Sequence, residues 1–145
     1  MLGQEDDLSW AGVWVLVVLL AAVMVGSGIL IIVVARRAAD GRTGVNKVAG
    51  IRTAATMSSD EAWLAAHVAG RRLTELGGRI AVIGGLASIP AAGVVAAAGG
   101  SRDATVLAAV GLSIGLGSVG VLVCVIAGAV VGHRAAVVVR DGFGS

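Results

Sequence analysis

The chain has 145 residues, of which 57% are hydrophobic and only 14% are charged, and its net charge is +2. Ordinary water-soluble domains contain fewer apolar and more charged residues, so the composition excludes a typical soluble domain and indicates a membrane protein. The small net charge gives no reason to expect nucleic-acid binding. Because helices satisfy their own backbone hydrogen bonds in lipid, we predict an all-α membrane protein.

Three uncharged segments are long enough to span a bilayer, since a helix needs about 20 apolar residues for this. The first is not a cleavable signal peptide, because it is long and follows acidic rather than basic residues. The predicted order is a short extracytoplasmic N-terminus (1–10), transmembrane helix 1 (11–35), a cytoplasmic loop (36–79), transmembrane helix 2 (80–101), transmembrane helix 3 (104–132) and a cytoplasmic tail (133–145).

Basic residues are concentrated between the first and second predicted spans. Most of the 11 Lys and Arg lie there, namely Arg36, Arg37, Arg42, Lys47, Arg52, Arg71, Arg72 and Arg79. Short loops rich in Lys and Arg remain cytoplasmic, so we expect the N-terminus outside and the C-terminus in the cytoplasm. Trp10 and Trp14 fall near the outer boundary of the first span, where indole rings anchor helices.

Small residues recur at about every fourth position in the second and third spans. Such stripes let helix backbones approach closely in a membrane. They predict either a hairpin of these two spans or a face for self-association or for a larger membrane partner. The residues assigned to helix packing are Gly84, Ser88, Ala92, Gly111, Gly115, Gly120, Gly128 and Gly132, with Cys124 as a small apolar side chain in the same stripe.

The loop contains the most polar and varied part of the sequence. Residues 45–57 lack helical periodicity and predict a connector, after which Ser58 and Glu61 have the spacing of a capping box. Apolar residues then recur at helical spacing, and Gly77-Gly78 interrupts the pattern. We therefore predict a separate amphipathic helix over about 59–76, lying along the cytoplasmic interface.

Neither a catalytic nor a metal-binding motif is present in the sequence. The two histidines and the single cysteine, Cys124, are too widely separated to predict a metal site. The one G-x-S-x-G match, residues 111–115, lies inside a predicted membrane span rather than after a strand, so it does not have the setting of a nucleophile motif, and there is no P-loop or H-E-x-x-H pattern. We expect no enzymatic activity, no cofactor and no metal.

The polar segment resembles a family signature. Asn46, the run Gly50-Ile51-Arg52-Thr53, a serine-rich helix start, Trp63 and Ala66-His67 follow one another as in the SdpI family of small bacterial membrane proteins. The resemblance covers residues 46–78 in detail and the flanking spans only in hydropathy. It implies an immunity and signalling protein that tethers a cytoplasmic protein at the membrane. The founding member is longer, so the resemblance supports the membrane module more than the immunity function.

Physical roles follow for the residues of this signature. Asn46, Gly50, Ile51, Thr53, Ser58, Glu61 and Gly70 are assigned structural roles in folding the loop onto the helix, and Gly50 is expected to need a positive φ or a close approach to a helix. Arg52, Trp63 and His67 combine a cation, an aromatic face and a titratable ring, and are the candidate binding residues. The acceptors considered for Arg52 are Asp60, Glu61, Glu75, lipid phosphate and backbone carbonyls at the cytoplasmic ends of the spans.

Two functions remain open. The first is a non-enzymatic interaction protein of the bacterial cytoplasmic (inner) membrane, of immunity or signalling type, whose cytoplasmic cap binds a protein partner. The alternative is a structural accessory subunit of a larger respiratory or cell-envelope complex, packed through the small-residue stripes. The lipid bilayer is one partner in either case, and a homo-oligomer stays open. A transporter is disfavoured, because no span carries a buried charge.

Overall fold

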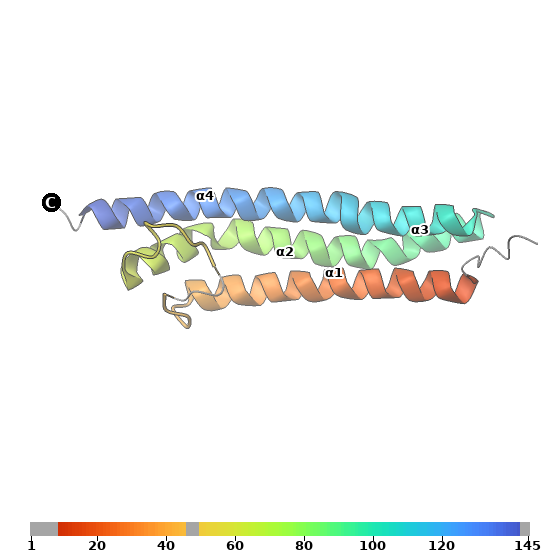
Figure 1. Ribbon diagram of the computed structural model, residues 1–145, viewed down its shortest axis with the longest axis horizontal. Helices are drawn as coiled ribbons and strands as arrows, with labels where there is room; N and C mark the ends of the chain where they lie inside the picture. Colours follow the sequence, from red (N-terminus) through yellow and green to blue (C-terminus); the bar gives the residue numbers. More distant parts are fainter. Residues whose placement is uncertain (1–8, 46–49, 143–145) are drawn as a thin grey trace, which may run out of the picture.

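Three long helical rods lie side by side, with the middle one antiparallel to the two outer ones, in a computed structural model that describes residues 9–45 and 50–142 (Figure 1). The elements are α1 (Trp10–Ala39), α2 (Asp60–Ala97), α3 (Arg102–Val110), the π-helix η1 (Gly111–Gly117) and α4 (Ser118–Gly142). The last three form one rod. All three rods are long and apolar enough to cross a membrane, and the described residues contain no strand. This confirms the prediction of an all-α protein with three spans.

A serine begins each of these three rods. The hydroxyl of Ser9 accepts a hydrogen bond from the backbone N–H three residues later, and Ser59 and Ser101 do the same. Each bond satisfies one of the donors that a helix start leaves unpaired. The sequence predicted Ser58 as the cap of α2, which is wrong: the Ser58 hydroxyl instead donates to the Ala55 carbonyl at 2.7 Å.

The helix α2 is continuous, and the predicted break at Gly77-Gly78 does not occur. The expected amphipathic helix and the second span form a single 38-residue helix, about 57 Å long at 1.5 Å per residue. The glycines are tolerated because α2 lies between the other two rods (Figure 1), and each glycine faces one of them. Tertiary packing therefore overrides the low helix propensity of glycine here.

Two glycine pairs, seven residues apart, make α2 the central helix. A Cβ added at Gly77 would lie 3.1 Å from the Cys124 Cβ in α4, whereas one at Gly78 would lie 2.7 Å from the Gly28 carbonyl oxygen in α1. Gly84 faces η1 and Gly85 faces α1 in the same way. Because the adjacent glycines of each pair serve opposite neighbours, α2 packs closely on both sides.

The small-residue seam between α2 and α4 continues toward the connector end. A Cβ on Gly70 would lie 2.6 Å from the Gly128 carbonyl oxygen, and a Cβ on Gly132 would lie 2.6 Å from the Ala66 carbonyl oxygen. Gly120 packs against Ile80. The predicted hairpin of the second and third spans is therefore present, built through these glycines.

Gly111 and Gly115 do not belong to this seam, contrary to the sequence prediction. A Cβ added at either would have no neighbouring atom within 4 Å. Both lie in η1, whose wider turn shifts the phase of the rod, so Gly111 and Gly115 still share one face but that face points away from α2. The buried positions of η1 are Ser113 and Gly117 instead.

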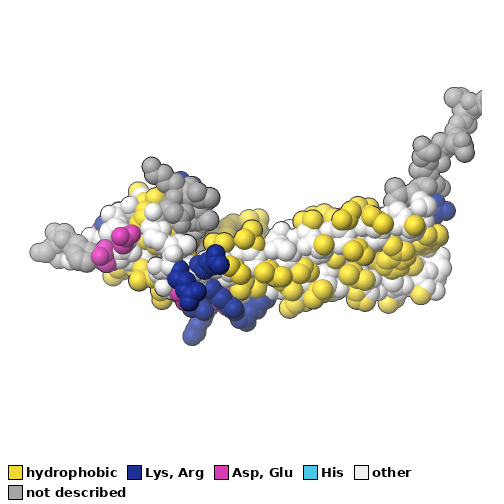
Figure 2. Space-filling view, turned by 90° about the horizontal axis from the view of Figure 1, so that it is seen from below, with side chains coloured by type: hydrophobic (Ala, Val, Ile, Leu, Met, Phe, Trp, Pro, Cys, Tyr) yellow, Lys and Arg dark blue, Asp and Glu magenta, His cyan; other side chains and the backbone are white. Residues whose placement is uncertain are grey.

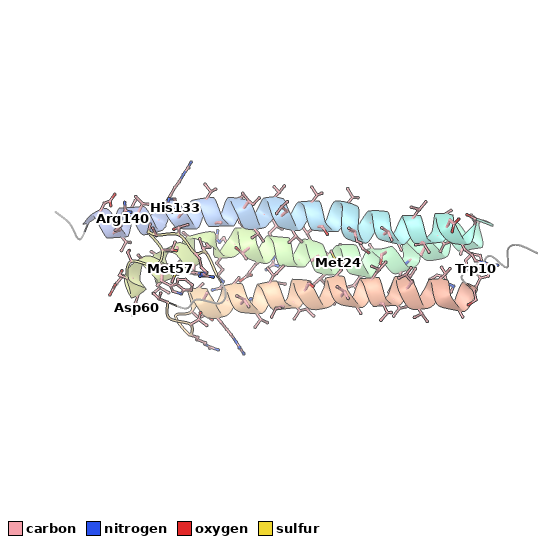
Figure 3. All side chains as sticks on the ribbon, viewed as in Figure 1. Trp10, Met24, Met57, Asp60, His133 and Arg140 are labelled. Atoms are coloured by element: carbon pink, nitrogen blue, oxygen red, sulfur yellow. The ribbon has the colours of Figure 1, made fainter. Side chains whose placement is uncertain are left out.

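Charged residues separate an apolar trunk from a polar end. Figure 2 shows Lys and Arg side chains gathered beside the apolar trunk, and the arginines paired with Glu75 at this boundary are Arg36, Arg71 and Arg79. We call these three the arginine belt. The uncharged part of α2 begins at Ile80, and residues 60–79 form the charged end of this helix. Trp10 lies at the opposite end of the molecule from Asp60, His133 and Arg140 (Figure 3).

Candidate functional site

The polar end carries a folded cap, which we define as connector residues 50–59 together with residues 60–70 of α2. The cap packs on the end of α4 through small side chains: Ala55, Ala62, Ala66 and Ala136 are all buried in one cluster. The first part of α2 therefore does not lie freely along a membrane surface. It is held between the connector and α4.

Gly50 lets the connector pass over α2. Its φ is 115°, a conformation that side chains disfavour. A Cβ at Gly50 would lie 2.5 Å from His67 Nε2 and 2.9 Å from Trp63 Cη2. Both features anticipated for this residue, a positive φ and a close approach to a helix, occur together.

His67 links the connector to α2 through both ring nitrogens. The backbone N–H of Ile51 donates to Nε2 at 3.1 Å, and Nδ1 lies 2.8 Å from the Trp63 carbonyl oxygen. Since a carbonyl only accepts, Nδ1 carries the proton and the ring is neutral. His67 is buried, and burial lowers the pKa of its imidazole, while the hydrogen bond to Trp63 opposes this shift only in part.

Acidification is expected to destabilise the cap through His67. The unfolded imidazole has a pKa of about 6.5 and the folded one titrates lower, so stability is complete above pH 6.5 and falls as the pH drops toward the folded pKa. Protonation would also place an Nε2–H against the Ile51 N–H. Thermal unfolding of wild type and His67→Gln between pH 8 and pH 5 measures this: the variant loses the dependence. His133→Gln removes the other imidazole, whose Nδ1 lies 3.0 Å from Thr53 Oγ1, and loss of the pH dependence in this variant but not in His67→Gln would contradict the assignment.

Trp63 is a structural residue of the cap. Its side chain is 2% exposed, its indole N–H donates to the Thr43 carbonyl at 2.9 Å, and its ring centroid lies 4.1 Å from that of His67. The ring therefore has little surface to offer a partner. The structure favours packing over recognition for this candidate binding residue.

Two threonines close a tight turn in the connector. The Thr56 hydroxyl donates to the Ile51 carbonyl at 2.7 Å and accepts from the Thr53 backbone N–H at 2.8 Å. Thr53 Oγ1 also lies 3.0 Å from His133 Nδ1, which ties the connector to α4. Thr56 is fully buried. The sequence predicted a structural role for Thr53 but missed Thr56, whose only signal was its spacing of three residues from Thr53.

Arg52 is the candidate binding residue that remains accessible. Its side chain is exposed, and none of the acceptors considered for it, Asp60, Glu61 and Glu75, forms an ion pair with it. Within residues 9–45 and 50–142 it has no hydrogen bond or ion pair. Arg52 is thus an exposed cation at the edge of the cap, without a partner among the residues that the structure describes.

Glu75 instead joins α1 to α2. Its side chain is only 10% exposed and lies 2.7 Å from Arg71, 3.3 Å from Arg36 and 3.4 Å from Arg79. Arg71 also pairs with Asp40 at 3.3 Å. The Arg71 guanidinium lowers the pKa of the Glu75 carboxyl, although burial opposes this. The spacing of four residues between Arg71, Glu75 and Arg79 could have predicted their ion pairs within α2. The ion pair with Arg36 could not be predicted in this way, because Arg36 lies in another helix.

Replacing Glu75 with Gln is expected to destabilise the protein by about 1–2 kcal/mol. The change leaves the arginine belt without its anion, but the three guanidiniums are 39–60% exposed, which weakens the repulsion. Chemical unfolding in mild detergent provides the measurement. Asp141→Asn removes an exposed pair with Arg140 and should change stability by less than about 0.5 kcal/mol. An equally small effect at Glu75 would contradict the bridging role.

A cavity of about 480 Å³ lies under the connector, which we call the cap cavity. Here α1 and α4 do not contact each other, although α1 contacts α3 near the opposite end. The wall consists of Leu30, Ile31, Val34 and Ala35 of α1, residues 50–53 of the connector, His67, Gly70, Arg71 and Thr74 of α2, and Val125 and Ala129 of α4. The cavity thus spans from apolar trunk to polar cap.

The structure brings most of the signature together. Gly50, Ile51, His67 and Gly70 meet at the cap cavity, where the Ile51 side chain reaches Gly70 and Gly132. Glu61 lies in the first turn of α2, where its carboxyl accepts from its own backbone N–H and from Ser59, and these bonds lower its pKa. Asn46 lies outside the described residues.

The fold and the cap define a multi-pass helical membrane protein whose central helix extends into a folded polar end. A model of the SdpI/YfhL protein family matches residues 42–133, more than half of the chain, from the start of the connector to the end of the α2–α4 seam. The chain belongs to this family and is a membrane protein of the SdpI type. No curated protein and no solved structure matches it.

Proposed function

We propose that the chain is a non-enzymatic interaction protein of the bacterial cytoplasmic membrane, whose cap binds a cytoplasmic protein. The observation that carries the proposal is the helical hairpin formed beyond the arginine belt by residues 60–70 of α2 and the end of α4. This hairpin exposes apolar side chains outside the membrane: Leu64 is 40% exposed and Val68 55%. The two side chains lie one helical turn apart on the same face, and contiguous apolar surface that is exposed to water supports a protein-binding role.

The orientation belongs to the same proposal. His133 and Arg140 lie at the end of the molecule opposite Trp10 (Figure 3), and the connector that carries Arg52 contacts His133 there through Thr53. The positive-inside rule places this basic end in the cytoplasm. A cysteine introduced at Ser58, in the exposed part of the connector, should then resist a membrane-impermeant thiol reagent in intact cells and react after lysis.

The test of partner binding is crosslinking in cells followed by purification in mild detergent. Leu64→Ser with Val68→Ser should lose a protein that wild type captures, while both insert equally and unfold at the same temperature. Leu122→Ser, on a 59% exposed residue of α4 within the trunk, is the control that keeps the partner. Trp63→Ala is unsuitable here because the ring is buried. Identical captured proteins from wild type and the double variant would refute the proposal.

One observation favours an accessory subunit as the second candidate. Gly111 and Gly115 leave open space on the outer side of η1, flanked by the exposed side chains of Ile114 and Leu116. A small-residue notch turned toward lipid fits another membrane helix. Under this alternative, Gly115→Leu would release the chain from a larger membrane complex. Recovery of the wild type only as a free monomer in mild detergent would count against it.

A further inference from the structure

We propose that the cap cavity binds an anionic phospholipid, with one acyl chain between α1 and α4 and the phosphate on Arg52. This lipid site is separate from the apolar hairpin proposed to bind a protein. Neither proposal depends on the other. Three features of the cavity lead to it: the chemistry of its walls, its position at the charged boundary of the trunk, and the exposed cation at its rim, which has no partner among the described residues.

The trunk side of the cavity has the chemistry of an acyl-chain site. Leu30 and Val34 of α1 face Val125 and Ala129 of α4 across it. These helices do not contact each other here, so the gap between them opens to the bilayer. A volume of about 480 Å³ lies within the roughly 300–1,000 Å³ typical of ligand sites.

The depth of the cavity matches the boundary between chains and headgroups. Ala35, the last α1 residue in the wall, directly precedes Arg36 of the arginine belt. The connector forms the polar side of the wall through residues 50–53. A lipid whose chain lies along the trunk would therefore place its phosphate beside the connector.

Arg52 is the group in this wall that can receive the phosphate. The His67 ring is occupied by Ile51 and Trp63, and the Thr74 hydroxyl donates to the Gly70 carbonyl. Arg71 is shared between Glu75 and Asp40. Arg52 lines the cavity with no partner among the described residues, and guanidinium groups bind phosphate with two parallel hydrogen bonds.

The surrounding charge selects an anionic lipid over a zwitterionic one. The arginine belt places three guanidiniums around one carboxylate beside the cavity. Basic side chains near a membrane surface attract anionic headgroups. A headgroup that adds its own cation, such as choline, would be repelled at the same place.

The test is native mass spectrometry of the protein reconstituted with equal phosphatidylglycerol and phosphatidylcholine. We expect at least tenfold preferential retention of phosphatidylglycerol, and at least a tenfold loss of this retention in Arg52→Gln. Arg72→Gln is the matched control, because Arg72 is exposed in the same region but does not line the cavity. It should lower retention by less than about fivefold, as expected for one surface cation.

Cavity-filling variants test the acyl chain at unchanged charge. Ala129→Phe should reduce phosphatidylglycerol retention as strongly as Arg52→Gln. If Ala129→Phe fails to fold, Leu30→Trp replaces it in the test, because Leu30 is 62% exposed and the larger side chain can be accommodated there. Glycerol 1-phosphate, which carries the phosphate without chains, should not displace the lipid. The proposal is overturned by equal retention of both lipids, by equal losses in Arg52→Gln and Arg72→Gln, or by displacement with glycerol 1-phosphate. A lipid-free dimer that Ala129→Phe dissociates would assign the gap to a second copy and also overturn it.

Discussion

Replacing Gly28 with Val is expected to separate α1 from α2 and to destabilise the protein by about 3 kcal/mol. A Cβ at Gly28 would lie 2.5 Å from the Gly78 carbonyl oxygen, 2.8 Å from Val82 Cγ2 and 3.0 Å from the Ala81 Cβ. The nearest atom belongs to the backbone and cannot rotate away. The helices must therefore move apart, which loosens the Gly85 contact with Ala21 one heptad along α2.

Gly26→Val is the matched control for this change. Gly26 lies in the same helix two residues earlier, and a Cβ there has no neighbour within 4 Å. The two substitutions share the same change in helix propensity and side-chain volume, so their difference isolates the contact with α2. Both are measured by unfolding in mild detergent with increasing dodecyl sulfate. Equal stabilities of the two variants would show that α1 and α2 do not pack through Gly28.

The number of helices long enough to span a membrane was predictable because it depends on the long uncharged runs in the sequence. Long uncharged runs can only become helices in lipid, and the structure has three rods of sufficient length. The end of the amphipathic helix was not predictable in this way. Gly77-Gly78 breaks a helix in isolation, but not one enclosed by α1 and α4, and only tertiary structure provides that enclosure.

The packing face of the third rod was predicted only in part. Gly120, Gly128 and Gly132 contact α2 as expected, because they lie in the regular helix α4. Gly111 and Gly115 do not, because the π-helix changes the phase at which residues return to one face. Gly28 was overlooked because its role depends on the position of Gly78 in another helix.

The side-chain contacts of the cap were likewise predicted only in part. The spacing of Trp63 and His67 placed them on one face of α2, and they do stack. Whether that face meets solvent or the connector depends on where Gly50 and Ile51 cross the helix, which is a long-range contact. The candidate residues were therefore recognised correctly as neighbours, while the division between buried Trp63 and exposed Arg52 required the fold.

Gly50→Ala is expected to open the cap, at a cost of about 3 kcal/mol. The cost combines about 1–2 kcal/mol for an alanine held at φ 115° with the displacement of His67 Nε2, which lies 2.5 Å from the new Cβ. Because the trunk packs through other contacts, we expect local opening rather than global unfolding. Faster hydrogen exchange at the Ile51 amide and greater quenching of Trp63 fluorescence would report it.

Gly99→Ala separates the two contributions to this effect. Gly99 has a φ of 80°, but a Cβ there meets no atom within 4 Å, so the variant carries backbone strain without the clash. We expect it to lower overall stability by about 1–2 kcal/mol and to leave exchange at Ile51 unchanged. If Gly50→Ala behaved like Gly99→Ala, the contact between the connector and His67 would not hold the cap closed. A selective rise in exchange at Ile51 would instead identify Gly50 as the residue that lets the connector lie against α2. Because the connector forms one wall of the cap cavity and carries Arg52, Gly50 would then also determine the shape of that wall and the position of Arg52.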